Sequence, residues 1–574
     1  MGDTFDQFTT QAKFADEAAL LERLKGQAEL SESDRTQISA RAAKLVRRIR
    51  TEAKPTLMEH FLAEYGLSTQ EGVALMCLAE AMLRVPDAET IDALIEDKIA
   101  PSDWGKHMGT ASSSMVNAST WALMLTGRVL EDEKPGMAGV LRGAVRRLGE
   151  PVIRAAVSRA MKEMGRQFVL GETIENALSR AKKLEDRGYT YSYDMLGEAA
   201  RTARDAKRYA KDYADAIAAI AKVCKDRPVA ENPGISVKLS ALHPRYEVAK
   251  EERAMAEIVP VLKDLAKAAK AGNMGLNIDA EEQDRLVISL KIIKEVLSDP
   301  ELAGWDGFGV VVQAYGKRAS LVIDWLGALA EKLDRKIMVR LVKGAYWDTE
   351  MKLAQVEGLP DFPLFTTKAA TDVSYLANAR KLFSYTDRIY PQFATHNAHS
   401  VAAILEMAEG RPYEFQRLHG MGERLHEIVH REEGTRCRIY APVGAHRDLL
   451  AYLVRRLLEN GANSSFVHQI VDEDVAPETI AEDPFVQLEN AERSAMLKLP
   501  SEVFAESREN STGFDLTDEG TLARIDAARN VSIPDAGPLV AGEATGHPST
   551  LLHGVSRLRR GVRFSLIVFY RPRS

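Results

Sequence analysis

The sequence is poor in cysteine, in net charge and in long apolar runs, and each shortage excludes a class of protein. Its three cysteines, Cys77, Cys224 and Cys437, are odd in number and far apart in 574 residues, which excludes a disulfide scaffold and indicates a reducing compartment. The 76 lysines and arginines stand against 83 aspartates and glutamates, giving a net charge of −7, which excludes a broadly basic nucleic-acid binder. No apolar stretch approaches the roughly 18 residues that span a bilayer, and the first residues lack the apolar core of a secretory signal. We therefore expect a cytoplasmic protein that at most touches a membrane surface.

Glycine-rich phosphate loops are also missing. The chain has no GxxxxGK(S/T) motif, and Gly420-Met421-Gly422 is followed by Leu425 where a dinucleotide fingerprint needs a third glycine. This excludes a Rossmann site. If a dinucleotide binds to this chain, it must be held in another way, with cations for its pyrophosphate, hydrogen-bonding groups for its ring and an aromatic wall. Residues with this chemistry are Arg340, Lys343, Tyr346, Trp347 and Lys368.

What is present divides into two patterns. Residues 1–150 read as helices, whereas from about 185 to 470 short β-rich runs alternate with amphipathic helical stretches, as in βαβ units. Eight such runs predict an α/β fold, a distorted (β/α)₈ barrel preceded by an α-helical domain, with a doubly wound sheet as the alternative. The predicted strands are 190–195, 235–240, 276–281, 309–315, 337–346, 391–396, 413–419 and 437–443.

Polar or aromatic side chains stand at or near the carboxyl end of each predicted strand. A barrel gathers these ends on one face, where active sites lie, and burying so many unpaired polar groups without a function would be costly. The sequence therefore predicts a site at this face, formed from Asp194, Lys238, Asp279, Gln313, Arg340, Lys343, Thr395, His396, Gln416 and Tyr440.

The stretch His426-Glu427-Ile428-Val429-His430 matches the HExxH zinc pattern, in which two imidazoles lie on one helical face and the glutamate acts as a base. A zinc hydrolase is thus the alternative function. No third ligand is evident, however, and the segment lies between two predicted strands, so we favour a solvated face of a connecting helix.

After the last predicted strand, Arg455 and Arg456 stand together on an otherwise apolar helix. Two guanidinium groups aimed at the barrel mouth would bind a carboxylate bidentately. Glu459 lies one helical turn after Arg455 and could orient that guanidinium. The alternative is that the two residues form a surface salt bridge that contributes little to stability.

Several long motifs resemble one family. The segments SVKLSALHPRY, VRLVKGAYWD, PQFATHNAHS, YEFQRLHGMGE and YLVRRLLENGANSSFV are similar to the proline dehydrogenase module of the bacterial proline utilisation A family, over about residues 10–540. The resemblance implies a helical domain beside a distorted barrel with non-covalent FAD. It also implies oxidation of L-proline to Δ1-pyrroline-5-carboxylate by hydride transfer to flavin N5, and transfer of the electrons to membrane quinone.

Site residues follow from the resemblance, position by position. Arg455 and Arg456 resemble the pair that binds the proline carboxylate, and Glu459 the partner of an arginine. Lys238 and Asp279 resemble polar groups near the substrate, and Tyr346, Leu418 and Tyr440 the walls around its ring. Residues that resemble flavin contacts are Gln313, Arg340, Lys343, Gly344, Ala345, Trp347, Thr366, Thr367, Lys368, Thr395, His396, Asn397, Gln416 and Phe466.

The expected organisation has five parts: a helical arm (1–40), a helical domain (41–170), the barrel (171–480), a linker (481–545) and an atypical basic tail (546–574). Compared with long family members, we expect neither an aldehyde dehydrogenase activity nor a DNA-binding ribbon-helix-helix, and hence no nucleic-acid partner. A folded but inactive fragment is a further alternative.

Overall fold

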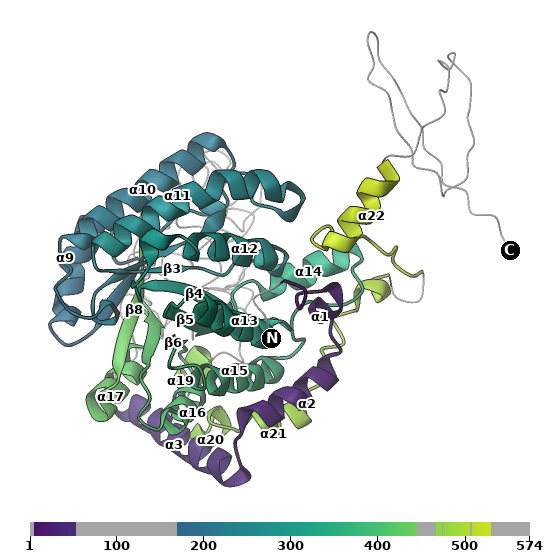
Figure 1. The fold of residues 1–574 in the computed structure, drawn as a ribbon. Helices are drawn as coiled ribbons and strands as arrows, with labels where there is room; N and C mark the ends of the chain where they lie inside the picture. The colour runs from purple at the N-terminus through teal and green to yellow at the C-terminus, as the bar shows by residue number, and fades with distance from the viewer. Residues whose placement is uncertain (1–4, 53–168, 445–465, 473, 505–507, 530–574) are drawn as a thin grey trace, which may run out of the picture. The chain divides into compact units, whose positions relative to one another are not determined.

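The fold is described from a computed structural model, which describes residues 5–52, 169–444, 466–472, 474–504 and 508–529. Its described residues form eight parallel strands that close into a barrel in sequence order, with the first strand hydrogen-bonded to the last (Figure 1). The strands are β1 (Thr190–Met195), β2 (Gly234–Val237), β3 (Gly275–Ile278), β4 (Phe308–Gln313), β5 (Ile337–Val342), β6 (Ile389–Ala394), β7 (Glu414–Leu418) and β8 (Arg436–Val443).

All eight predicted strands are present, and the predicted barrel is confirmed. Some strands are shorter than predicted. β5 ends at Val342 rather than at Tyr346, because Gly344 has a positive φ of 145°, outside the extended range of a strand. β3 ends at Ile278, so that Asp279 lies in the loop that follows.

Amphipathic helices cover the outside of the barrel. Their apolar faces are buried and their first turns are often capped: Thr202 and Asp205 form a capping box on α10, and Thr367 and Asn397 cap α15 and α16. These helices are α9 (Ile174–Glu185), α10 (Ala203–Ala221), α11 (Glu251–Ala271), α12 (Leu286–Leu297), α13 (Ala319–Lys332), α14 (Trp347–Glu357), α15 (Lys368–Phe383), α16 (Ala398–Ala408) and α17 (Glu423–Glu433).

An N-terminal arm and a C-terminal segment pack on this barrel. The arm comprises α1 (Thr10–Lys13), α2 (Glu17–Ala28) and α3 (Glu32–Glu52); α2 packs on α15 and α3 on α16. The buried ammonium of Lys13 bonds to Asp284 at 2.8 Å and to Asp515 at 2.9 Å, so it joins the arm, the barrel and the C-terminal segment. The C-terminal segment is the part of the chain from residue 466 to residue 518. It contains α19 (Phe466–Val471), α20 (Pro477–Ile480) and α21 (Pro484–Glu489), and α22 (Glu519–Arg529) follows it.

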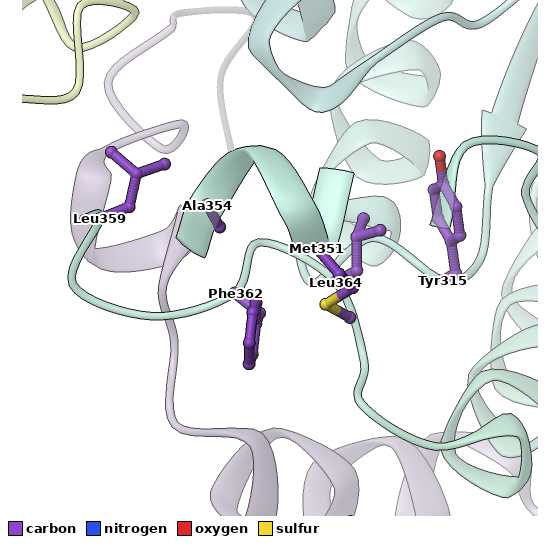
Figure 2. Close-up of a cluster of buried hydrophobic side chains, with 6 residues drawn as sticks. All are labelled: Tyr315, Met351, Ala354, Leu359, Phe362 and Leu364. Carbon is purple, nitrogen blue, oxygen red and sulfur yellow. The ribbon is translucent and has the colours of Figure 1, made fainter. Parts of the chain in front are cut away.

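A small hydrophobic cluster fixes α14 beside the carboxyl end of the barrel. Partly buried Trp347 and Leu499 pack against it, so the helix is held from its first residue onward. Figure 2 shows the cluster, which consists of Tyr315, Met351, Ala354, Leu359, Phe362 and Leu364.

The chain divides into two compact units, Met1–Thr521, which contains the barrel, and Leu522–Ser574. Among the described residues, no helix combines the length and the apolar character needed to cross a bilayer.

Candidate active site

A buried charge cluster lies where β1, β2 and β3 end. The Lys238 ammonium forms an ion pair with Asp194 and lies 3.4 Å from the nearer carboxylate oxygen of Asp279. Burial by itself would lower the pKa of Lys238, but the charges of Asp194, Tyr440 and Asp279 raise it well above its usual value. Lys238 is therefore a fixed ammonium in the barrel mouth.

Asp279 is surrounded by donors. Its Oδ1 accepts a hydrogen bond from Arg340 Nη1 at 3.0 Å, and its Oδ2 accepts one from the Tyr440 hydroxyl at 2.7 Å. The Arg340 guanidinium also donates to Ser192 and Ser236, at 3.2 and 3.1 Å, and lies 5.1 Å from the centre of the Tyr440 ring. Burial and two carboxylates raise the pKa of Tyr440 well above its usual value, so Tyr440 acts as a donor. The predicted convergence of Lys238, Asp279, Arg340 and Tyr440 is observed.

The loop from Lys343 to Trp347 forms the next part of the rim. Gly344 packs so closely on Tyr315 that an added Cβ would lie 2.2 Å from its ring, which, with the positive φ, requires glycine. The Ala345 N–H donates to Gln313 Oε1 at 3.3 Å, so two predicted flavin contacts touch each other. Tyr346 and Trp347, at the start of α14, are partly exposed.

Two predicted cations share one buried carboxylate. Lys343 pairs with Asp372, and Lys368 Nζ lies 2.7 Å from its other oxygen. Although burial raises the pKa of Asp372, the two ammonium groups hold it well below its usual range. The arrangement places Lys343 and Lys368 together near the first turn of α15.

The predicted contacts before α15 lie against the N-terminal arm. Glu17 of α2 accepts hydrogen bonds from the Thr366 N–H and hydroxyl, both at 3.0 Å, and Thr367 caps α15. An open groove is lined by Glu17, Thr366 and Thr367. The arm thus forms one wall beside these residues.

The residues after β6 and in β7 form a second hydrogen-bonded group. The Leu418 N–H donates to His396 Nε2 at 3.1 Å, and Thr395 Oγ1 accepts from the Asn397 N–H at 3.1 Å. Gln416 Nε2 donates to Glu414 at 2.8 Å, while its Oε1 is buried without a hydrogen-bond partner among the described residues.

The contacts described above do not include four of the predicted site residues. Arg455, Arg456 and Glu459 lie outside the described residues. Phe466 begins α19 and is partly buried.

The histidines of the zinc pattern contact carbonyl groups. His426 is 1% exposed and its Nε2 lies 2.8 Å from the Thr395 carbonyl; His430 contacts the carbonyls of Thr435 and Arg187 at 2.6 and 3.1 Å. No group of three potential metal ligands occurs among the described residues. The zinc alternative is thus unsupported, and the solvated face that we favoured is wrong for His426, which packs into the barrel wall.

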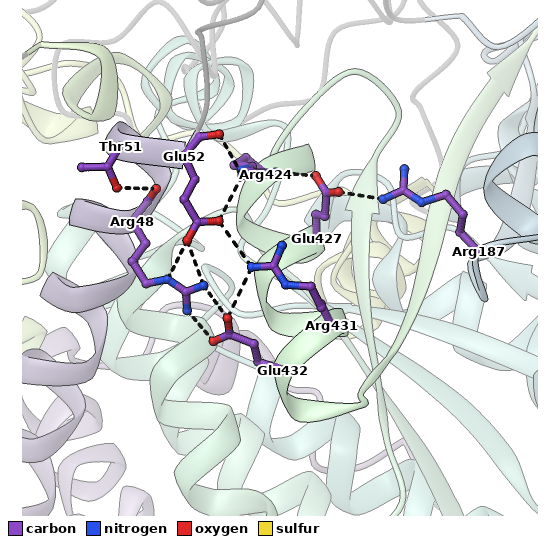
Figure 3. A network of polar contacts seen from close by, with 8 residues as sticks. All are labelled: Arg48, Thr51, Glu52, Arg187, Arg424, Glu427, Arg431 and Glu432. Carbon is purple, nitrogen blue, oxygen red and sulfur yellow. Dashed lines mark hydrogen bonds and ion pairs between the residues drawn. The ribbon is translucent and has the colours of Figure 1, made fainter.

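Residues on the exposed face of α17 form ion pairs with neighbouring segments. Glu427 bonds to Arg187 at 2.7 Å and to Arg424 at 2.9 Å, and Glu432 pairs with Arg48 of the arm (Figure 3). This network joins α17 to the end of α3.

Sequence reasoning missed three supporting groups. Asp194 is predicted as a polar strand end but not as the partner of Lys238, and neither Ser192 nor Asp372 is singled out by any motif. For β1 a signal exists: Ser192 and Asp194 alternate along the strand, as residues that share one face must.

Three family profiles match parts of the chain. The family profile described as "Proline dehydrogenase" matches residues 177–469, and "Proline utilization A proline dehydrogenase N-terminal domain" matches residues 7–50. A third profile, "DNA-binding domain of Proline dehydrogenase", matches residues 57–168. The name of this profile contradicts our expectation that the chain has no nucleic-acid partner, and we give up that expectation. Residues 57–168 lie outside the residues that the structure describes.

Similar proteins carry related names. The chain is 49% identical over 527 residues to "Bifunctional protein PutA" of Salmonella typhimurium, covering 88% of this chain but only 40% of that protein. It is 30% identical over 309 residues to "Proline dehydrogenase 1" of Bacillus subtilis, covering 53% of this chain and 88% of that one. A crystal structure of a proline utilization A variant from Bradyrhizobium japonicum superposes with a TM-score of 0.72 at 49% identity, over 92% of this chain and 53% of the other. The chain thus belongs to the proline dehydrogenase family, and it spans less than half of the length of the PutA protein that it matches.

Proposed function

We propose that this chain oxidises L-proline to Δ1-pyrroline-5-carboxylate with bound FAD and passes the electrons to a quinone. The observation that carries the proposal is a group of bonded side chains at the carboxyl face of the barrel, in which Lys238 and Arg340 are buried and Asp279 and Tyr440 are half-buried. The names of the similar proteins supply the substrate class.

The residues present fit a flavin. Arg340 Nε and Gln416 Oε1 are buried polar atoms without partners among the described residues, so each can still bond a ligand. Lys343 and Lys368 provide cationic groups suited to a pyrophosphate. When bound, FAD would supply the acceptor for the hydride that proline loses.

The chain's own residues would orient the substrate. In the proposal, Arg455 and Arg456 bind the proline carboxylate bidentately, Glu459 orients one of them, and Tyr346, Leu418 and Tyr440 enclose the ring. Fixing the carboxylate places the reacting C–H in one orientation, which is a large part of the rate gain available to such a site.

Asp279 would then hold the side chains of Lys238, Arg340 and Tyr440 in fixed positions. It accepts hydrogen bonds from Arg340 and Tyr440 and lies near Lys238, so these three side chains cannot move independently. The Arg340 cation would help to hold a bound flavin and would favour negative charge on it.

We place the protein in the cytoplasm, at times peripheral to the inner membrane, because the proposed quinone acceptor lies in the bilayer.

The test is the visible absorption spectrum of the purified chain before and after anaerobic addition of proline. We expect a yellow protein whose flavin absorbance bleaches with proline, and whose electrons then reduce an added quinone analogue. A colourless protein that cannot be reconstituted with FAD would contradict the proposal.

A further inference from the structure

A buried carboxyl group lies behind the predicted site and takes no part in the mechanism above. Glu350 on α14 is 4% exposed. Its Oε1 accepts the Tyr315 hydroxyl at 2.7 Å, and its Oε2 accepts the backbone N–H of Gln283 at 2.9 Å. Within the described residues, no ion pair to lysine or arginine accompanies these two bonds. A carboxyl group buried at this cost, with only neutral donors, requires an explanation.

These two bonds join three loops of the carboxyl face. Gln283 lies in the loop after β3, four residues beyond Asp279. Tyr315 lies in the turn after β4, two residues beyond Gln313. Glu350 itself follows β5, on the helix that begins at Trp347. The carboxyl group thus connects the segments that carry Asp279, Gln313 and Tyr346.

Tyr315 transmits the position of Glu350 to the rim. Its N–H donates to the Lys343 carbonyl at 2.8 Å, and its ring packs under Gly344. A hydrogen bond from the backbone of Tyr346 also acts on its hydroxyl. Figure 2 shows Tyr315 at one side of the cluster that holds Met351 of α14.

We propose that Glu350 is a positioning residue for the proline site, which holds Tyr346 and the Lys343–Trp347 loop through Tyr315 and does so best as a carboxylate. This inference rests on the proposed function. The reason is the number of acceptors. The two oxygens of a carboxylate accept from Tyr315 and Gln283, whereas a protonated acid or an amide has one carbonyl oxygen. If that oxygen stays on the Gln283 N–H, which can only donate, the group turns its own O–H or N–H toward the Tyr315 hydroxyl. The Tyr315 hydroxyl then loses its acceptor and the contact with Tyr346 is disturbed.

Protonation of this group belongs to an accessible pH range. Burial, together with the nearby charges of Asp284 and Glu282, raises the pKa of Glu350 to about 8, against the lowering effect of the bonds from Tyr315 and Gln283. Two other titratable groups lie close: Arg318, whose Nη2 bonds to the Gln283 carbonyl at 2.9 Å, and Tyr346 at the start of α14.

The experiment compares Glu350→Gln with Glu357→Gln, which makes the same change on an exposed residue of the same helix. The probe is cyclopentanecarboxylate, which has the ring and carboxylate of proline but no amine to titrate. Its binding to the flavin-loaded proteins is followed by the change in flavin absorbance between about pH 6.5 and about pH 9.5.

We expect the wild type to bind the probe more tightly as the pH rises through about 8, where Glu350 loses its proton. Glu350→Gln should lack this rise, binding within about twofold of the wild type at the acidic end and on the order of tenfold more weakly at the alkaline end. Glu357→Gln should follow the wild type throughout. Tyr315→Phe should behave like Glu350→Gln, and the double variant should be no weaker than either.

Two outcomes would overturn the inference. One is a Glu350→Gln protein whose affinity follows the wild type across the range. The other is a loss that is equal at every pH and accompanied by a lower unfolding temperature, since this would make Glu350 purely structural. If the wild type is not bleached by proline, it is instead the proposed function that fails.

Discussion

Two of the buried ionic clusters in the described part of the barrel differ in completeness. Toward the amino ends of β7 and β8, Glu414 accepts from Gln392, Gln416 and Arg438, and Arg438 donates further to the carbonyls of Tyr191, Asn232 and Ala230. We call this cluster closed because the Glu414–Arg438 pair at its centre has no buried side-chain N or O atom without a partner among the described residues, although Gln416 Oε1 at its edge has none. At the carboxyl face, Arg340 Nε and Asp194 Oδ2 are buried without partners among the described residues. The comparison teaches that a closed network stabilises the barrel, whereas an open one is a place for a ligand.

The largest effect is expected from breaking the closed cluster. Glu414→Ala leaves the Arg438 guanidinium buried without its carboxylate, which should lower the free energy of unfolding by about 3–5 kcal/mol. Chemical denaturation measures it. The control is Glu295→Ala, whose side chain is 56% exposed beside Lys263 and should change stability by less than about 0.5 kcal/mol. Equal losses in both variants would contradict the distinction.

Next in size is the loss of the proposed carboxylate site. Arg455→Met and Arg456→Met should each raise the KM for proline by the equivalent of about 2–4 kcal/mol, because a bidentate contact is lost, while flavin stays bound. Steady-state kinetics and the flavin spectrum test this. Arg253→Met, at a side chain 61% exposed on α11, serves as the control. An unchanged KM in both variants would mean that the carboxylate binds elsewhere.

A smaller effect is expected within the open cluster. Tyr440→Phe removes the 2.7 Å bond to Asp279 but leaves that of Arg340 in place. Loss of one hydrogen bond to a charged acceptor should lower kcat/KM by a factor equivalent to about 1.5–3 kcal/mol of free energy. If the cluster only stabilised the fold, thermal unfolding would shift and kcat/KM would not.

The smallest effect is expected on the surface network of Figure 3. Bonds from Arg48 hold the pKa of Glu432 at about 2, below its ordinary 4.5. A lowered pKa contributes stability above the unfolded value, which is lost as the pH falls from about 4.5 to about 2. Glu432→Gln should therefore lower stability slightly above about pH 4.5, in a salt-dependent way, and should match the wild type below about pH 2, where the Glu432 carboxyl is protonated in both states. Acid titrations at low and high salt test this; a large, salt-independent change at neutral pH would contradict it.

Local sequence patterns were sufficient for the barrel and for part of its site. Apolar β-rich runs such as that of β4 can be recognised because every residue of that strand is buried, and parallel strands bring their carboxyl ends to one face by topology alone. This is why Lys238, Asp279, Arg340 and Tyr440 could be predicted to meet.

Only the tertiary structure decided the partners. His426 and His430 match a metal pattern locally, but their ring nitrogens contact carbonyl groups from other elements, which no spacing reveals. Glu350 looks like any helical glutamate in the sequence, and is buried only because Tyr315 and Gln283 are brought to it from two other loops. The sequence determines periodicity and strand ends because these depend on neighbours along the chain, whereas burial and pairing depend on residues that are distant in sequence and adjacent only after folding.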